Sequence, residues 1–406
     1  MTRVQLTNKT YISTATDDVK LFYPRSQMQS GELISGFQVN RKLIDGLTKA
    51  EVVFFSMFWK PIGDSFLFLS VLTACLEYLQ LTRLNNMPKI IIDDTFSNLI
   101  RHLNILTEYE FISHAVDWFK QSVRENKNVV LITDDDPFTM GESPAVFNTE
   151  EYVYPKFHEK LVDGDIIDYP SRPARYFLTF EREVGIRLKS DPNLSLPDFI
   201  MNDDITLTQK CINDFGIDLD TPGLTFLGVI NQTSMVEKKF GGLRYLEVID
   251  KLYELNKNIA VLFLANTKEE SPSEWLAVLE KIKKSPYKVY LIDSRDFELL
   301  AYMFARCKLV LGNDTGFSHL AAMCKRSLLA PNVPCVITYS RHDYGKWSTG
   351  KENVYPVVTE LSQYLKDSNS SISRDKIDVT NWGLKEWAYS ISEDAVFNRI
   401  KKIWEK

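Results

Sequence analysis

Residues 309–322 read LVLGNDTGFSHLAA and decide the fold. The apolar run at 309–311 has the composition of a buried strand, and it ends at Gly312. A short polar turn follows, and the small residues after it are typical of a helix start. Backbone N–H groups at a helix start lack partners in the helix, and with the helix dipole they attract phosphate. The stretch therefore predicts a strand, a turn and a helix that together form a cradle for a diphosphate.

Side chains in the same stretch are candidates for that cradle. Thr315 and Ser318 offer hydroxyl donors, and His319 falls on the first helical turn, where it can face the same anion. In the alternative interpretation, Asp314 or Thr315 merely caps the helix, as happens at most strand-to-helix turns. These residues alone leave both interpretations open.

Apolar runs of strand length alternate with helical patterns through most of the chain, and this alternation is typical of parallel sheets covered by helices. One series of strands is expected at residues 51–56, 88–92 and 128–133, with a helix over residues 65–80. A second series is expected at residues 224–230, 260–264, 288–292 and 308–311, with an amphipathic helix over residues 245–255. The pattern predicts an α/β fold with two doubly wound, Rossmann-like domains.

A proline-bounded polar stretch at residues 190–197 separates the two series and is typical of a connection between domains. We place the boundary near residue 200, which gives an N-terminal domain of residues 51–200 and a C-terminal domain of residues 201–406. Residues 1–50 show no clean strand-helix unit and are expected to form an extension packed on the N-terminal domain. Two doubly wound domains side by side would bind ligands between the carboxyl edges of their sheets.

Composition excludes several classes of function. The hydrophobic fraction of 44% and the charged fraction of 25% are ordinary for a folded globular protein. A net charge of -6 gives no electrostatic footprint for nucleic acid. The polar start lacks the apolar core of a secretory signal, so we expect a cytoplasmic location. The most apolar stretch, residues 66–76, is shorter than the roughly twenty residues of a membrane span and predicts a buried helix.

The five cysteines are scattered, without a C-x-x-C pair or a histidine at ligand spacing. We therefore expect reduced, mostly buried thiols. This spacing predicts no metal site.

A second candidate segment, residues 233–240, follows directly after the strand that ends at Ile230. Its hydroxyls and Lys238 lie at the carboxyl end of a strand, where they could bind the same phosphates. A lysine in a loop is more often simply solvated, and that interpretation stays open.

A third segment, residues 60–65, forms the first strand-to-helix turn of the N-terminal domain. Gly63 lets the backbone approach a ligand closely, and Asp64 could remove a proton from an attacking hydroxyl. An aspartate before an apolar helix is also a strong N-cap signal, so a structural role competes with the catalytic one.

Together the three segments resemble glycosyltransferase family 9, the heptosyltransferases of bacterial lipopolysaccharide synthesis. Residues 312–322 are similar to the family's D-[ST]-G-x-x-H-x-A-A signature, and residues 62–67 to its I-G-D-x-L motif. Residues 233–238 match a T-[TS]-x-x-x-K pattern more loosely. The resemblance runs from about Val52 to the C terminus. It implies the GT-B fold, in which two Rossmann-like domains face a central cleft.

The resemblance implies an inverting, metal-independent glycosyltransferase of hexosyl or heptosyl type that needs no cofactor. The donor would be a nucleoside-diphosphate sugar. The acceptor would be a hydroxyl of a glycan, lipid-linked saccharide or protein, with a role in cell envelope polysaccharide. Asp64 would be the general base. The expected donor-binding residues are Gly63, Thr233, Ser234, Lys238, Asp314, Thr315, Gly316, Ser318 and His319, with Glu269 or Glu270 for the ribose hydroxyls.

Departures from the family pattern leave the identity of the donor and the acceptor open, and two other functions are considered beside the transferase. Phe240 stands where a tryptophan is common, and Gly241 and Gly242 replace proline and acidic neighbours. A non-catalytic relative that binds nucleotide sugars or serves as a partner subunit is one alternative, and a GT-B nucleotide-sugar epimerase is another. The basic terminal helix, residues 392–406, could touch the inner face of the membrane or cross back to the first domain, as in many GT-B chains. We expect at most peripheral membrane contact and no nucleic acid partner.

Overall fold

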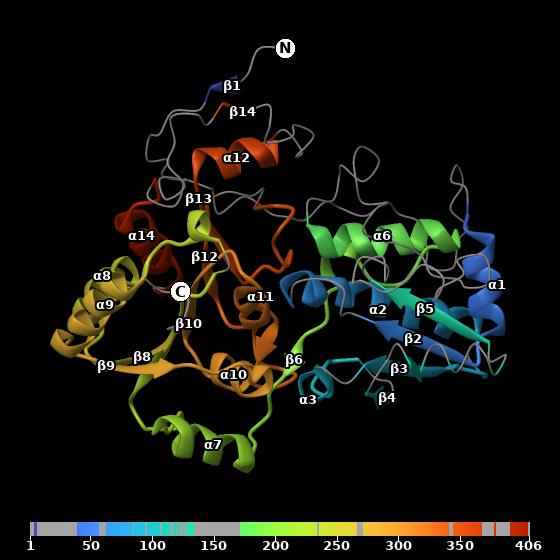
Figure 1. Ribbon diagram of the computed structural model, residues 1–406, viewed down its shortest axis with the longest axis horizontal. Coiled ribbons are helices and arrows are strands. Elements are labelled where there is room, and N and C mark those ends of the chain that lie inside the picture. Colours follow the sequence, from blue (N-terminus) through green and yellow to red (C-terminus); the bar gives the residue numbers. More distant parts are fainter. Residues whose placement is uncertain are drawn as a thin grey trace. The chain divides into compact units, whose positions relative to one another are not determined.

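The computed structural model contains two compact units, one of residues 22–197 and one of residues 198–406 with residues 1–21. The structure describes residues 4–5, 39–56, 62–83, 85–93, 96–105, 108–113, 117–118, 121, 125, 128–133, 171–233, 235–265, 271–340, 344–367, 377–378 and 390–404. Each unit is built on a parallel β-sheet with helices packed against it, so the predicted α/β class is confirmed (Figure 1).

The N-terminal unit, residues 22–197, has a four-stranded parallel sheet in the order β4-β3-β2-β5. Its strands are β2 (Val52–Ser56), β3 (Lys89–Asp93), β4 (Tyr109–Ile112) and β5 (Val129–Thr133). Three of them were predicted, because their continuous apolar runs are typical of strands buried on both faces. The edge strand β4 was not predicted, because its side chains are only partly buried and Glu110 interrupts the apolar run.

Helix α2 (Ile62–Thr82) forms the core of this unit, as expected for its apolar segment. It is the one helix in the described ranges that is long and apolar enough to cross a membrane, but most of it is buried inside the protein. Its Phe68 ring stacks on Phe55 of β2 at 5.1 Å and meets Tyr176 edge-on at 5.2 Å. Tyr176 belongs to α6 (Arg172–Val184), the main helical neighbour of α2.

The first fifty residues divide between the two units. Helix α1 (Arg41–Lys49) begins after the N-cap Asn40 and packs on α6 and β5 of the N-terminal unit. Strand β1 (Val4–Gln5) instead pairs in parallel with β14 (Ile377–Asp378) of the C-terminal unit. For β1, this pairing differs from the expected packing on the N-terminal domain.

The C-terminal unit, residues 198–406, has a six-stranded sheet in the order β13-β12-β10-β7-β8-β9, all parallel. Its strands are β7 (Thr225–Ile230), β8 (Ile259–Leu264), β9 (Lys288–Ile292), β10 (Leu309–Asn313), β12 (Cys335–Tyr339) and β13 (Val354–Val358). Strands β7 to β10 were predicted within a residue or two. The centrally placed β10 carries the start of the LVLGNDTG stretch.

Helices cover both faces of this sheet (Figure 1). Leu227 and Leu311 share a core cluster with Tyr245 of α8, whereas Gly312 faces the other side, against Ser318 of α11. The first face is covered by α8 (Gly242–Leu255), α9 (Pro272–Lys284) and α14 (Glu393–Trp404). The second group consists of α7 (Ile205–Phe215), α10 (Phe297–Phe304) and α11 (Gly316–Met323), with α10 in contact with the other two.

The smaller elements complete the two units. They are α3 (Ser97–Ile100) and η4 (Pro192–Leu194) in the N-terminal unit, and η5 (Val236–Lys238), α12 (Glu360–Asp367) and the strand pair β6 (Phe199–Ile200) with β11 (Cys324–Lys325) in the C-terminal unit.

The terminal helix α14 packs against α8 in the C-terminal unit. Arg244 of α8 forms an ion pair with Glu393 at the start of α14 and donates to the carbonyl of Ile391. At the other end, Ile403 and Trp404 pack against the core cluster. The apolar residues of this basic helix thus contribute to the core of the unit.

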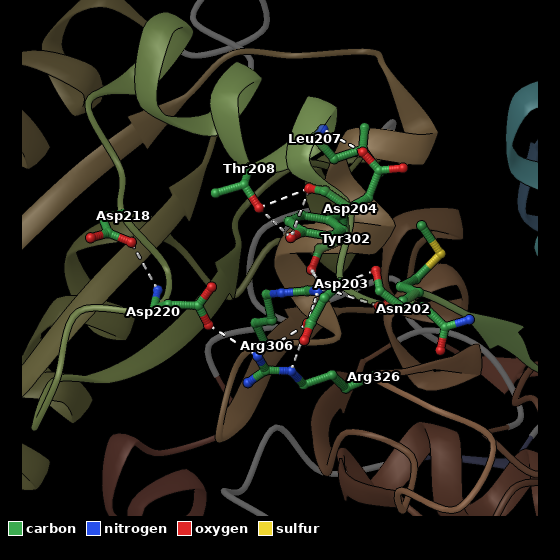
Figure 2. A network of polar contacts seen from close by, with 11 residues as sticks. Asn202, Asp203, Asp204, Leu207, Thr208, Asp218, Asp220, Tyr302, Arg306 and Arg326 are labelled. Atoms are coloured by element: carbon green, nitrogen blue, oxygen red, sulfur yellow. Dashed lines mark hydrogen bonds and ion pairs between the residues drawn. The ribbon is translucent and has the colours of Figure 1, made fainter.

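A network around Arg306 fixes the amino edge of the C-terminal sheet (Figure 2). The Arg306 guanidinium donates to Asp203 at 2.7 Å and to the carbonyls of Met201 at 3.2 Å and Tyr302 at 3.1 Å. Arg326 joins Asp203 to Asp220, at 3.1 and 3.0 Å. We call these residues the Arg306 network. It ties the end of α10 to the segment before α7 and to the residue after β11.

All five cysteines are free and buried, as expected. Burial raises the pKa of the Cys211 thiol to about 11. It also raises the pKa of the other four thiols. They therefore remain protonated and serve as small apolar side chains.

Candidate active site

The central feature at the carboxyl edge of the C-terminal sheet is an ion pair between Lys238 and Asp314. Lys238 ends the 3-10 turn η5 after β7, and Asp314 follows β10 directly. The ammonium Nζ lies 3.0 Å from Oδ2 of Asp314 and donates to the Asp314 carbonyl at 3.3 Å. The side chains are 14% and 4% exposed. Lys238 is therefore not a freely solvated loop lysine. Both residues follow strands, as the sequence predicted, and these two strands pair with each other.

Asn313, at the end of β10, holds the segment after η5 in place. Its fully buried Oδ1 accepts from the Phe240 N–H at 2.9 Å and from the Tyr245 hydroxyl at 3.1 Å. Its Nδ2 donates to the carbonyls of Asn231 at 3.0 Å and Ile230 at 3.3 Å. One amide thus joins the ends of β7 and β10 to the start of α8. The sequence analysis gave Asn313 no role, although a side chain with both donor and acceptor atoms at a strand end was a usable signal.

The first turn of α11 offers the helix start that the sequence predicted. Thr315 occupies the N-cap with an extended backbone, φ −153 and ψ 160, and its hydroxyl makes no capping hydrogen bond to the described residues. Its carbonyl accepts from the N–H groups of Ser318 at 3.0 Å and His319 at 3.2 Å. Thr315 thus occupies the capping position without a capping hydrogen bond, and the Asp314 carboxylate forms an ion pair with Lys238.

Ser318 has a structural contact at the strand-helix junction. Its hydroxyl donates to the Asn313 carbonyl at 2.6 Å, and the residue is 1% exposed. A Cβ atom at Gly312 would lie 2.4 Å from the Ser318 Oγ, so glycine is required for β10 and α11 to meet this closely. The hydroxyl proton that the sequence assigned to a phosphate is thus used inside the protein.

His319 lies on the first turn of α11 and is 4% exposed. Its Nδ1 has no hydrogen-bond partner in the described part of the chain. Burial lowers the pKa of His319 to about 4, with the Asp314 carboxylate acting in the opposite direction and Lys238 in the same direction. The imidazole is therefore neutral near pH 7 and can form hydrogen bonds to a ligand without adding charge.

Tyr339 ends β12, next to Asp314, whose N–H donates to the neighbouring carbonyl of Thr338 at 3.1 Å. Its buried hydroxyl finds no hydrogen-bond partner among the residues that the structure describes. Burial raises the pKa of Tyr339 well above its usual value, and the Asp314 charge adds to this effect. Tyr339 was missed by the sequence analysis, because a tyrosine that ends an apolar strand gives no distinctive pattern.

The other candidate residues of the C-terminal unit are less clearly placed. Thr233 forms a local turn in which its Oγ1 accepts from the Met235 N–H at 3.4 Å. Ser234, Glu269 and Glu270 lie outside the described residues, so their predicted contacts with phosphate and ribose stay predictions.

Gly63 and Asp64 belong to the N-terminal unit, on the first turn of α2. The predicted helix was to begin at Ser65, but α2 begins at Ile62, so Asp64 lies inside the helix rather than in the turn before it. A carboxylate in a first turn interacts favourably with the helix dipole. Both residues are partly exposed and follow β2, at the carboxyl edge of their own sheet. The turn residues Lys60 and Pro61 lie outside the described residues.

Comparison with known proteins gives a family match for part of the chain and a fold. Residues 202–366 match the sequence model of the family described as glycosyltransferase family 9 (heptosyltransferase). A search of curated protein sequences gives no match. Among solved structures, a glycosyl transferase family 9 protein from Veillonella parvula DSM 2008 aligns with a TM-score of 0.59 at 15% identity. The alignment covers 89% of this chain and 99% of that chain.

Two further structures come from E. coli. ADP-heptose lps heptosyltransferase II aligns with a TM-score of 0.56 at 12% identity, over 87% of this chain and 98% of that chain. Heptosyltransferase WaaC with ADP aligns with a TM-score of 0.50 at 13% identity, over 86% of this chain and 99% of that chain. At such identities the likeness shows the fold alone.

The two parallel-sheet units have the GT-B fold, the fold of these structures. The family match covers residues 202–366, which lie within the C-terminal unit.

Proposed function

We propose that this glycosyltransferase moves a sugar from a nucleoside-diphosphate sugar to an acceptor hydroxyl, with inversion at the anomeric carbon. The observation that carries the proposal is the position of the Lys238–Asp314 pair, beside the first turn of α11 at the carboxyl edge of its sheet. Ligands of open α/β sheets bind at this edge. The ADP bound to WaaC, a protein of the same fold, adds support.

In the proposed reaction, the donor diphosphate binds at Lys238 and the N-terminal N–H groups of α11. Cleavage of the sugar–phosphate bond builds negative charge on the diphosphate, so a fixed ammonium group and fixed N–H dipoles stabilise the transition state more than the ground state. Neutral His319 contributes a hydrogen bond without charge. This scheme requires no metal ion.

Asp64 would act on the acceptor. Its carboxylate takes the proton of the acceptor hydroxyl while that oxygen attacks the anomeric carbon from the side opposite the leaving diphosphate. Attack from that side inverts the anomeric configuration. We extend the proposal to a glycan, lipid-linked saccharide or protein acceptor and to cell envelope polysaccharide. We also propose action in the cytoplasm, with at most peripheral membrane contact.

The donor site is tested by thermal unfolding of the purified protein with a panel of nucleoside diphosphates and nucleotide sugars. A ligand that binds only the folded state raises the melting temperature. We expect a selective shift that the Asp314→Ala variant loses and the Asp203→Ala control, from the Arg306 network, keeps. No shift with any member of the panel would contradict the proposal and favour a non-catalytic relative. Conversion of the donor without an acceptor would indicate an epimerase.

The catalytic base is tested with Asp64→Asn. General-base catalysis contributes on the order of 10²- to 10⁴-fold to a rate, so turnover should fall by about this factor while donor affinity is retained. The matched control is Asp45→Asn, an exposed aspartate on α1 of the same unit. Turnover close to that of the wild type in Asp64→Asn would show that another group takes the proton.

A further inference from the structure

Two aromatic side chains stack at the carboxyl edge of the C-terminal sheet. Phe297 is the first residue of α10, and Phe317 is the second residue of α11. Their ring centroids lie 5.7 Å apart with an angle of 27° between the ring planes. Both side chains are partly exposed. We call these two residues the phenylalanine stack.

The topology places the stack beside the proposed diphosphate site. Helix α10 follows β9 and α11 follows β10, and because the strands are parallel, both helices begin at the carboxyl edge. Phe317 lies on the first turn of α11, three residues after Asp314 of the Lys238–Asp314 pair. A ligand with its phosphates at the first turn of α11 would therefore extend its next groups along this edge.

The stack differs from the aromatic rings in the packed interior of the same unit. Tyr245, Tyr302 and Phe263 are at most 1% exposed and belong to the packed interior. A partly exposed pair of rings beside a charged group offers a flat apolar surface, which suits a flat aromatic ligand. Stacking of a nucleic acid base on an aromatic side chain is a recurrent mode of base binding.

We propose that the phenylalanine stack is the platform on which the nucleobase of the donor rests. The inference rests on the proposed function, and it separates two parts of donor recognition. Lys238 and the N–H groups of α11 bind the diphosphate, while Phe317 and Phe297 bind the base. The competing explanation is that the two rings only join α10 to α11.

The test compares ligands with and without a base. Affinities for ADP, GDP, UDP and inorganic pyrophosphate are measured by titration calorimetry for the wild type, Phe317→Leu and Phe297→Leu. Leucine retains apolar volume but has no aromatic face. We expect affinity for the nucleoside diphosphate that binds the wild type to fall about tenfold or more, with affinity for pyrophosphate unchanged. Phe317→Tyr keeps an aromatic ring, so its affinity for the nucleoside diphosphate should equal that of the wild type.

The chain offers a matched control in Tyr253, whose ring lies 5.6 Å from that of Tyr287. This pair sits at the opposite edge of the sheet, near the end of α8 and the start of β9. Tyr253→Leu should leave both affinities unchanged. Equal nucleoside diphosphate affinity in the wild type and both leucine variants would overturn the base platform, and so would an equal loss for pyrophosphate. Failure of the wild type to bind any nucleoside diphosphate would instead reject the proposed function itself.

Discussion

The two polar clusters of the C-terminal unit use similar residues and differ in how completely their hydrogen bonds are formed. In the Arg306 network, Tyr302 shares a hydrogen bond of 2.6 Å with Thr208, and Arg306 is bound to Asp203 and to backbone carbonyls. One nitrogen of Arg306, Nε, is buried without a partner in the described ranges, and the guanidinium lies 3.4 Å from the Tyr302 ring centroid.

At the carboxyl edge, two buried polar atoms of neighbouring residues lack a hydrogen-bond partner among the described residues. Nδ1 of His319 and the hydroxyl of Tyr339 are buried and meet no partner in the described part of the protein. Buried polar atoms in folded proteins are nearly always hydrogen-bonded, and the exceptions require an explanation. We infer that the amino edge is organised for stability, and we propose that the carboxyl edge accepts a ligand.

The largest effects are expected when the cation of each cluster is replaced by glutamine, and the two replacements should change different properties. In Lys238→Gln, nucleoside diphosphate affinity should fall about a hundredfold, because charge-assisted hydrogen bonds to phosphate are lost. In Arg306→Gln, the free energy of unfolding should fall by about 3 kcal/mol, because several hydrogen bonds of a charged group are lost. Calorimetric titration and denaturant unfolding measure the two quantities.

Lys239→Gln is the control for Lys238→Gln, because this neighbouring lysine pairs with Glu274 at 3.6 Å instead of Asp314. It should retain wild-type affinity. A loss of ligand affinity in Arg306→Gln equal to that in Lys238→Gln would remove the distinction between the two clusters.

His319 gives the second prediction, a pH dependence of stability. Its pKa is about 4 when folded and about 6.5 when unfolded, so the unfolded chain binds more protons between these values. The free energy of unfolding should therefore decrease as the pH falls through this window, by about 2 kcal/mol between pH 7 and pH 5. Denaturant unfolding at a series of pH values should show a shallower slope for His319→Asn. Identical slopes would mean that His319 is not held neutral by burial.

The fold was largely predictable because most strands of both sheets are buried on both faces. Residues 225–230 and 309–311 give continuous apolar runs that are easily seen in the sequence. Strands at the margin give weaker signals. β13 lies at the sheet edge and contains Pro356, a residue that would be expected to interrupt a central strand. β4 also lies at a sheet edge, where its residues are only partly buried. Its sequence includes the exposed Glu110, so it gives no continuous apolar run.

The sequence predicted that the candidate residues follow strands, but it did not predict their contacts with one another. Lys238 and Asp314 were each predicted to follow a strand, and parallel strands bring their carboxyl ends to one edge. Their ion pair depends on the local path of η5, which Asn313 fixes by accepting from the Phe240 N–H. The use of Ser318 within the protein likewise depends on the close approach of β10 and α11. Such contacts arise from packing and leave no periodic pattern in the sequence.

The smallest effects are expected when the tyrosine of each cluster, Tyr302 or Tyr339, is replaced by phenylalanine. Tyr302→Phe removes hydrogen bonds to Thr208 and to the Asp204 carbonyl, at 2.6 and 3.3 Å, and should cost about 1 kcal/mol of unfolding free energy. Tyr339→Phe removes a hydroxyl that has no partner in the described ranges, so the unliganded protein should keep its stability or gain up to about 1 kcal/mol. Denaturant unfolding of both variants measures the difference. A cost for Tyr339→Phe equal to that for Tyr302→Phe would show that the Tyr339 hydroxyl is already satisfied without a ligand.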